Sequence, residues 1–105
     1  MNTYVHVVGL NHLNITVYIG DTLILRPTMI SIDDTINELC IEAKLLETGI
    51  ESSVIGYVGR EFLGMAHKYE NRLCCVVKLY SDSNNRQEQK VSKERAGVCL
   101  CKLID

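Results

Sequence analysis

Residues that mark disordered, secreted or membrane-spanning chains are scarce in this sequence. Its 105 residues include one proline and seven glycines, too few for a low-complexity or disordered chain. Met1 is followed by Asn2 and Thr3, without the basic start and unbroken apolar stretch of a signal peptide. No apolar run approaches the length that crosses a bilayer. We therefore expect one soluble, cytoplasmic domain over residues 1–105, with no membrane contact.

Motifs that carry metal or catalytic chemistry are also missing. The stretch around Asp33, Asp34 and Glu38 lacks the alternating oxygen ligands and central glycine of a calcium loop. No nucleophile elbow, H-x-x-x-H pair or phosphate-binding loop is present. We therefore expect a binding protein and not an enzyme, with no catalytic residue, no resident metal and no small-molecule cofactor.

The five cysteines are odd in number and lack the paired C-x-x-C spacing of a zinc site. We interpret them as reduced thiols, most of them small core residues. An alternative stays open, because Cys99 and Cys101 project to the same face of their expected strand. With Cys74 or Cys75 on a neighbouring strand, they would be able to ligate zinc.

A broad excess of positive charge is absent, since the formal net charge is −2. Residues 1–77 carry five basic and nine acidic side chains, whereas residues 78–105 carry six basic and four acidic ones. Nonspecific nucleic-acid affinity comes chiefly from lysine and arginine. The charge therefore argues against a protein that binds nucleic acid nonspecifically through a broad basic surface. A local basic edge near the C-terminus remains possible.

Alternating apolar and polar residues predict a chain made mostly of strands. The clearest case begins at Leu39, where Leu39, Ile41, Ala43 and Leu45 share one face. Pro27 is expected to end a strand because proline cannot donate to a sheet ladder. The expected strands cover 4–10, two pieces within 15–26 that break at Gly20-Asp21, 39–46, 53–58, 73–80 and 96–104. Residues 28–37 are expected to form a packed loop, Thr48-Gly49 a turn and residues 81–92 a long polar connection.

One segment has helical periodicity. Phe62, Met65, Ala66 and Tyr69 fall at i, i+3, i+4 and i+7, which predicts an inserted α-helix over residues 60–71 that ends at Asn71. Short strands with one helix favour a small closed or partly open β-barrel, which avoids exposing sheet edges.

Four stretches occur in an order that resembles the HIRAN domain family over roughly residues 5–80. They are Val7-Val8-Gly9-Leu10, Gly20 to Pro27, Ile41-Glu42-Ala43 and Ile55-Gly56-Tyr57-Val58-Gly59-Arg60-Glu61. The last stretch, which leads into the helix, is the most specific, although Gly59 replaces the usual proline. The resemblance implies an OB-like or SH3-like barrel with one helical insertion, here a stand-alone member of the kind found in bacteria and phages.

The function implied by this resemblance is non-catalytic binding of nucleic acid, with single-stranded DNA or its 3′ end as the ligand. The family's Arg-Tyr-Tyr-like run, which stacks on bases, is replaced by Asn11, His12 and Leu13. The residue that accepts a bond from a 3′ hydroxyl corresponds to Asp33, Asp34 or Asn37, depending on the alignment. The expected binding residues are Asn11, His12, Arg26, Asp34, Tyr57 and Arg60.

Three of these residues also have a structural interpretation. Tyr57 would stack on a base or pack half-buried in its strand, and Arg26 and Arg60 would contact phosphate or form ordinary salt bridges. The alternative function is a protein-interaction or self-association module without DNA binding, which includes a homo-oligomer. It is favoured by the strands at 73–80 and 96–104, which are apolar on both faces. One face packs in the core, and the second face then needs another surface to pack against.

Overall fold

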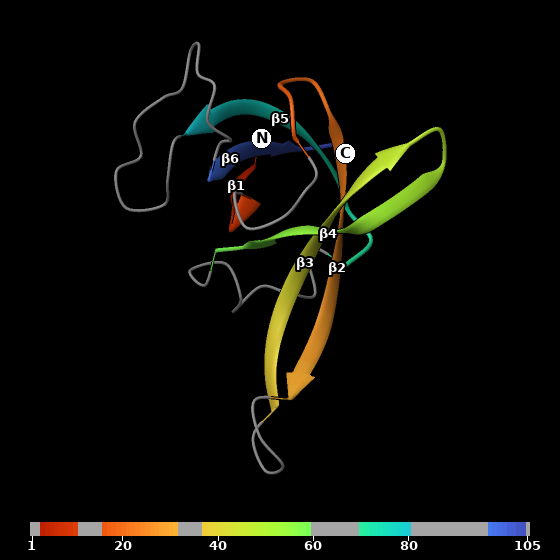
Figure 1. Cartoon of the computed structure of the whole chain (residues 1–105), viewed down its shortest axis with the longest axis vertical. Coiled ribbons are helices and arrows are strands. Elements are labelled where there is room, and N and C mark those ends of the chain that lie inside the picture. The colour runs from red at the N-terminus through yellow and green to blue at the C-terminus, as the bar shows by residue number, and fades with distance from the viewer. Residues whose placement is uncertain (1–2, 11–15, 32–36, 60–69, 81–96, 105) are drawn as a thin grey trace.

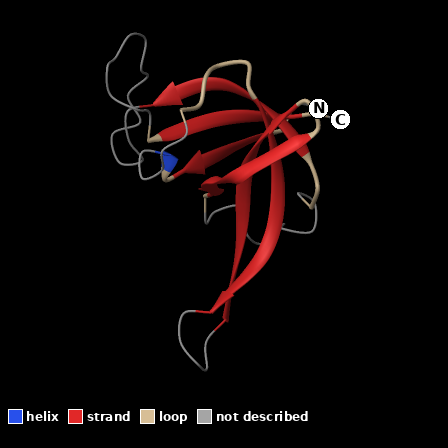
Figure 2. Cartoon of the chain, turned by 45° about the vertical axis from the view of Figure 1, so that its right-hand side comes forward, coloured by secondary structure: helices blue, strands red, loops and turns tan. Residues whose placement is uncertain are grey.

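The computed structural model describes residues 3–10, 16–31, 37–59, 70–80 and 97–104 of the chain. The strands are β1 (Tyr4–Val8), β2 (Thr22–Ser31), β3 (Asn37–Glu47), β4 (Ile50–Val58), β5 (Leu73–Tyr80) and β6 (Val98–Leu103). They confirm the mainly β fold class. Within the described part, helical structure is limited to a single 3₁₀ residue at Leu10 (Figure 2), and no helix there is long and apolar enough to cross a membrane.

The six strands form a closed antiparallel barrel in the order β1-β4-β3-β2-β5-β6 (Figure 1). β2, β3 and β4 follow one another, and β1 lies beside β4, which is a Greek-key arrangement. Pairing of β1 with β6, from Tyr4 opposite Lys102 to Val8 opposite Val98, closes the barrel. Closure pairs the edges that an open sheet would expose, as the sequence predicted.

Alternation along each strand sends one set of side chains into the barrel. The inward face predicted for β3 is confirmed, because Ile41 and Ala43 are fully buried. Leu39 and Leu45 on the same face pack against this core. Burial of each large apolar side chain contributes roughly 1.5–3 kcal/mol. The largest fully buried side chains of the core are Val5, Val7, Leu23, Leu25, Ile41, Ile55, Val76, Val98, Cys74, Cys99 and Cys101.

The prediction that Pro27 ends a strand is wrong, because β2 continues through it to Ser31 and residues 28–31 are strand, not loop. The Leu25 N–H donates to the Arg72 carbonyl, so it points away from β3. Pro27 is two residues further along and directs its nitrogen to the same side, beyond the last pair between β2 and β5 at Ile24. Its missing N–H therefore leaves the ladder with β3 intact.

Two strand pieces were expected between Ile15 and Arg26. The prediction of the first piece is wrong over its described residues, because residues 16–19 form no strand. The carboxylate of Asp21 accepts a hydrogen bond from the Tyr18 N–H at 2.8 Å, and the Asp21 N–H donates to the Tyr18 carbonyl at 3.1 Å. These bonds close a turn through Gly20, whose φ is +97°. The break expected at Gly20-Asp21 is therefore confirmed as a turn.

The hairpin between β3 and β4 turns at Thr48-Gly49, as predicted, with φ values of +50° and +81°. β4 starts at Ile50, three residues before the expected Ser53. Residues 50–52 of β4 were not predicted as strand. Register shifts between β3 and β4 disturb the alternation of apolar and polar residues there. At one irregularity the Leu45 N–H donates to the side-chain oxygen of Ser52 at 2.9 Å.

The helix predicted over residues 60–71 lies outside the described residues except for its last two positions, and so does the polar connection at 81–92. Glu70 and Asn71 form a turn that leads into β5. Asn71 has a φ of +57°, a left-handed conformation that asparagine tolerates better than most residues. Its N–H donates to the Leu25 carbonyl at 3.0 Å, which ties the turn to β2.

Candidate nucleic-acid interface

Two of the six residues predicted to bind nucleic acid, Arg26 and Tyr57, are described by the structure. The other four lie outside the described residues and stay predictions: Asn11, His12, Asp34 and Arg60. Arg26 on β2 pairs opposite Glu42 on β3, and Glu42 pairs opposite Tyr57 on β4. Paired residues share a face of the sheet, so Arg26 and Tyr57 lie in one row on the outside of the barrel, with an acidic residue between them.

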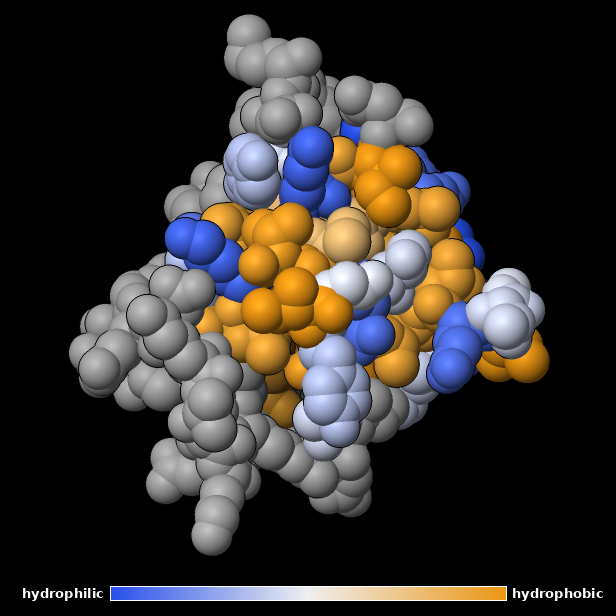
Figure 3. Space-filling model, turned by 90° about the horizontal axis from the view of Figure 1, so that it is seen from above, coloured by the Kyte–Doolittle hydropathy of each residue, from blue (hydrophilic) through white to orange (hydrophobic). Residues whose placement is uncertain are grey.

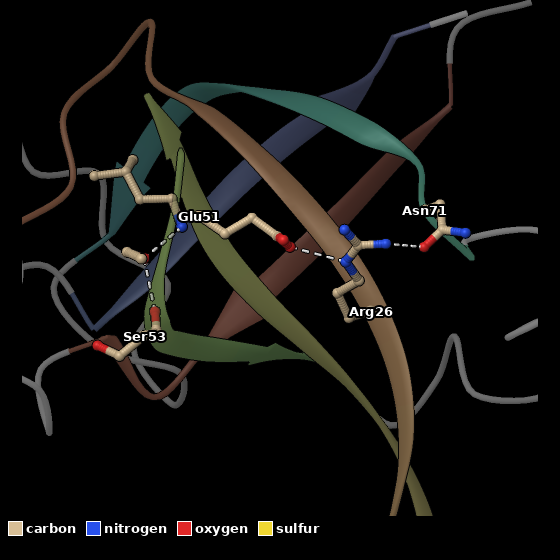
Figure 4. A network of polar contacts seen from close by, with 6 residues as sticks. Arg26, Glu51, Ser53 and Asn71 are labelled. Carbon is tan, nitrogen blue, oxygen red and sulfur yellow. Dashed lines mark hydrogen bonds and ion pairs between the residues drawn. The ribbon is translucent and has the colours of Figure 1, made fainter. Parts of the chain in front are cut away.

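The guanidinium of Arg26 is already occupied by protein groups. Its Nε donates to a carboxylate oxygen of Glu51 at 2.8 Å, and Nη1 donates to the side-chain oxygen of Asn71 (Figure 4). The ion pair links β2 to β4, and Asn71 comes from the turn before β5. A phosphate would have to compete with Glu51 for this arginine. The salt-bridged interpretation of Arg26 is therefore the one that the structure supports.

The Arg26–Glu51 pair should leave a small pH dependence in stability. Hydrogen bonding and charge from Arg26 hold the pKa of Glu51 below its usual 4.5. The stabilisation is complete above the unfolded-state pKa and is lost as the pH falls through the lower folded-state value. Urea unfolding should give wild type a higher midpoint than Glu51→Gln at pH 7, and the difference should shrink as the pH falls below the usual pKa of glutamate. With about a third of each side chain exposed, the difference should be small. A gap of constant size would contradict this account.

Tyr57 keeps 41% of its surface exposed, which leaves its ring accessible at the outer face of β4. Its strand neighbours in the row are Glu42 on one side and Val8 of β1 on the other. The three strands β2, β3 and β4 together carry two basic and four acidic residues. An aromatic ring is thus present on this half of the barrel, but the surrounding charge disfavours a polyanion.

The opposite half of the barrel has a different composition. Strands β1, β5 and β6 contain no acidic residue, and they carry Lys78 and Lys102. The register aligns two rows of outward side chains across these strands. One row runs from Tyr4 through Lys102 to Cys75, and the other from His6 through Leu100 to Lys78. We call this surface the β5–β6–β1 face.

Aromatic rings lie beside the lysines on the β5–β6–β1 face. The rings of His6 and Tyr80 meet edge to face across β6, with centroids 6.2 Å apart. Tyr4 is 43% exposed, Lys78 is exposed, and Lys102 is half-buried. Rings interleaved with lysines on adjacent strands are the arrangement with which β-barrels hold single strands, through base stacking and phosphate contacts.

The sequence analysis missed these residues. The excess of basic residues after position 78 was the available signal, together with the two apolar faces expected for the strands at 73–80 and 96–104. Neither signal shows that Tyr4 and His6, near the N-terminus, share a surface with these strands. Only the pairing of β1 with β6 brings them together.

The cysteines divide between the two sides of the barrel wall. Cys74, Cys99 and Cys101 are fully buried, and the sulfur atoms of Cys99 and Cys101 are 3.5 Å apart, so these two share a face as expected. Cys75 is half-buried on the outer face. Within the described ranges, no group of three or more histidine, cysteine or acidic side chains has a geometry that would hold a metal ion.

Comparison of the chain with protein-family models, with curated proteins and with solved structures finds no match. The case for a function therefore depends on the geometry of the two outer halves of the barrel and on the sequence motifs.

Proposed function

We propose that this chain is a non-catalytic module that binds single-stranded nucleic acid, and that the β5–β6–β1 face is its binding surface. The observation that carries the proposal is the composition of this face. Three aromatic rings and two lysines lie on three adjacent strands that contain no acidic residue. The resemblance of residues 5–80 to HIRAN domains supports the same class of function, with a different set of contact residues.

Each group on the face has a defined part in this proposal. Lys78 and Lys102 lie in neighbouring rows and contact successive phosphates. The exposed faces of Tyr4 and Tyr80 stack on bases, which is favourable for every base and therefore independent of sequence. Leu100 lies between these groups and provides apolar surface for sugar and base edges. Two phosphate contacts make the affinity modest and sensitive to salt.

Fluorescence anisotropy with a labelled twelve-nucleotide oligothymidylate tests the proposal. We expect binding at 50 mM salt that weakens about sevenfold at 200 mM, as two phosphate contacts on a single strand imply. The double variant Lys78→Glu/Lys102→Glu should bind at least about tenfold more weakly. Lys44→Glu makes the same kind of charge change on β3, outside the face, and should bind within about twofold of wild type.

The remaining outcomes separate the function from the location of the site. Absence of binding at 50 mM salt would exclude the function. Binding that survives the double variant but is lost in Arg26→Gln would keep the function and move the site to the row of Arg26 and Tyr57. An oligonucleotide with a phosphorylated 3′ end tests the terminal hydroxyl, since equal affinity for both ends would exclude 3′-end recognition.

One observation favours the alternative function, a protein-interaction or self-association module. Leu100 and Val77 direct apolar surface outward from β6 and β5, where they are half-buried. Light scattering after size exclusion distinguishes the two functions. A dimer that Leu100→Lys dissociates, together with absence of oligothymidylate binding, would assign the face to self-association.

A further inference from the structure

A groove lies at one end of the barrel, between the β3–β4 hairpin and the turn at residues 16–21. The hairpin extends past the barrel at this end (Figure 1). A cavity of about 300 Å³ is lined by Thr16, Tyr18, Asp21, Leu45 and Glu47. A second cavity of about 240 Å³ continues along the hairpin and shares Leu45 and Glu47 with the first. The two cavities therefore form one groove across the inner face of the hairpin.

The groove combines apolar surface with negative charge. Tyr18 and Ile50 on its walls are 65% and 71% exposed, so both present apolar surface to a ligand. Glu47 pairs directly opposite Ile50 on the hairpin, and Asp21 faces them from the turn. Neither cavity is lined by a lysine, arginine or histidine. Figure 3 views this end of the molecule and shows hydrophobic surface exposed between hydrophilic side chains.

The third acidic residue of the lining, Glu51, is neutralised on its outer side by Arg26 at 2.8 Å. Glu47 and Asp21 are therefore the charges that the groove offers to a ligand. One carboxylate oxygen of Asp21 accepts a hydrogen bond from the Tyr18 N–H. This bond fixes the position of the Asp21 side chain beside the cavity. A ligand that matches this surface carries positive charge next to a large apolar group.

The dimensions of the groove favour a peptide over a small molecule. Each cavity is at or below the lower end of the range for enclosed small-molecule sites, about 300–1,000 Å³. Two adjoining cavities on one surface suit side chains two positions apart in an extended chain, because successive side chains point to opposite faces.

We propose that this groove binds an extended segment of a partner protein in which the residues at every second position, on the face toward the groove, alternate between basic and large apolar. An apolar side chain packs on Leu45 between Tyr18 and Ile50, and a lysine or arginine pairs with Glu47. The groove and the β5–β6–β1 face share no lining residue, so this inference does not depend on nucleic-acid binding. It gives the module a means of attachment to another protein.

Anisotropy with a fluorescein-labelled heptapeptide in which leucine and arginine alternate at every second position, with serine between them, tests the proposal. Glu47→Lys should weaken binding at least about tenfold, because it places like charges together. Ile50→Ser should weaken binding about fivefold through loss of apolar contact. The matched control is Glu42→Lys on the outer face of β3, which should bind within about twofold of wild type. Circular dichroism of each variant establishes that the barrel is retained.

Three results would overturn the proposal. In the first, the wild-type chain shows no binding of the heptapeptide at 1 mM, or Glu47→Lys loses no more affinity than Glu42→Lys. In the second, heptalysine binds as tightly as the alternating peptide, which would reduce the groove to a general acidic surface. In the third, the chain is a dimer that Ile50→Ser converts to a monomer, which would assign the groove to a second copy of the chain.

Discussion

Replacement of Gly56 by alanine should lower the free energy of unfolding by about 3 kcal/mol. Gly56 is buried in β4 where the strand passes β1. A Cβ atom there would lie 2.6 Å from the backbone oxygen of Val8 and 2.9 Å from a methyl group of Val7. The oxygen belongs to a paired strand and cannot move aside without loss of the β1–β4 ladder. Urea unfolding followed by far-ultraviolet circular dichroism measures the loss.

Gly49→Ala provides the matched control for this prediction. Gly49 has a φ of +81° in the hairpin turn, and an added Cβ would meet no atom within 4 Å. Its substitution should cost only the backbone strain of a left-handed alanine, about 1 kcal/mol. Equal losses for the two variants would show that β1 adjusts to the methyl group and that the close approach at Gly56 has no energetic consequence.

Gly56 also gives a physical reason for part of the sequence motif. The Gly-Tyr pair before the expected helix carried much of the family resemblance. Gly56 lies opposite Ala43 on β3, so two small residues face each other where Leu10 and Val7 enter the core. The glycine is therefore explained by packing of the barrel. Tyr57 next to it points outward and contributes nothing to this contact.

The sequence predicted the strands well wherever alternation was regular. Leu39 to Leu45 alternates because one face of β3 is buried along most of its length, and β5 was predicted with its observed bounds. Pro27 was misjudged for a different reason. A proline ends a strand only if its nitrogen points to an edge of the strand that is paired with a neighbour. At Pro27 that edge is unpaired, because the contact between β2 and β5 is short and ends at Ile24.

The candidate site was less accessible from the sequence than the fold. Arg26 was correctly placed on a strand, but its partner Glu51 is 25 residues away, beyond a hairpin with two register shifts. The β5–β6–β1 face depends on side chains from both ends of the chain. Periodicity predicts which residues of one strand share a face, and it says nothing about which strands become neighbours.

The three interior cysteines should be almost inert in the native protein, which is the second large effect expected. Cys74 on β5 and Cys99 and Cys101 on β6 are fully buried in the core on the inner side of these two neighbouring strands. Hydrogen bonding with the thiols of Cys74 and Cys99, together with burial, raises the pKa of Cys101 well above its usual value. A protonated, inaccessible thiol is not a nucleophile. Reaction then requires unfolding, which makes it at least about a thousandfold slower than for an exposed thiol.

Ellman's reagent at pH 8 measures this difference directly. We expect the half-buried Cys40 and Cys75 to react first, and the other three of the five thiols to react at the rate of unfolding. In denaturant all five should react quickly. The Cys40→Ser/Cys75→Ser variant should retain the fold and show no fast phase.

A fast phase in that double variant would show that an interior thiol reaches solvent from the native state. The interpretation as core residues would then fail, and the zinc alternative would need a direct metal assay on the purified chain. Slow reaction of all three thiols would instead assign them to packing when the same assay finds no bound zinc, because zinc also protects a thiolate from the reagent. In that case the chemistry of this barrel lies on its outer surface, in the lysines and rings of β1, β5 and β6 and in the acidic groove.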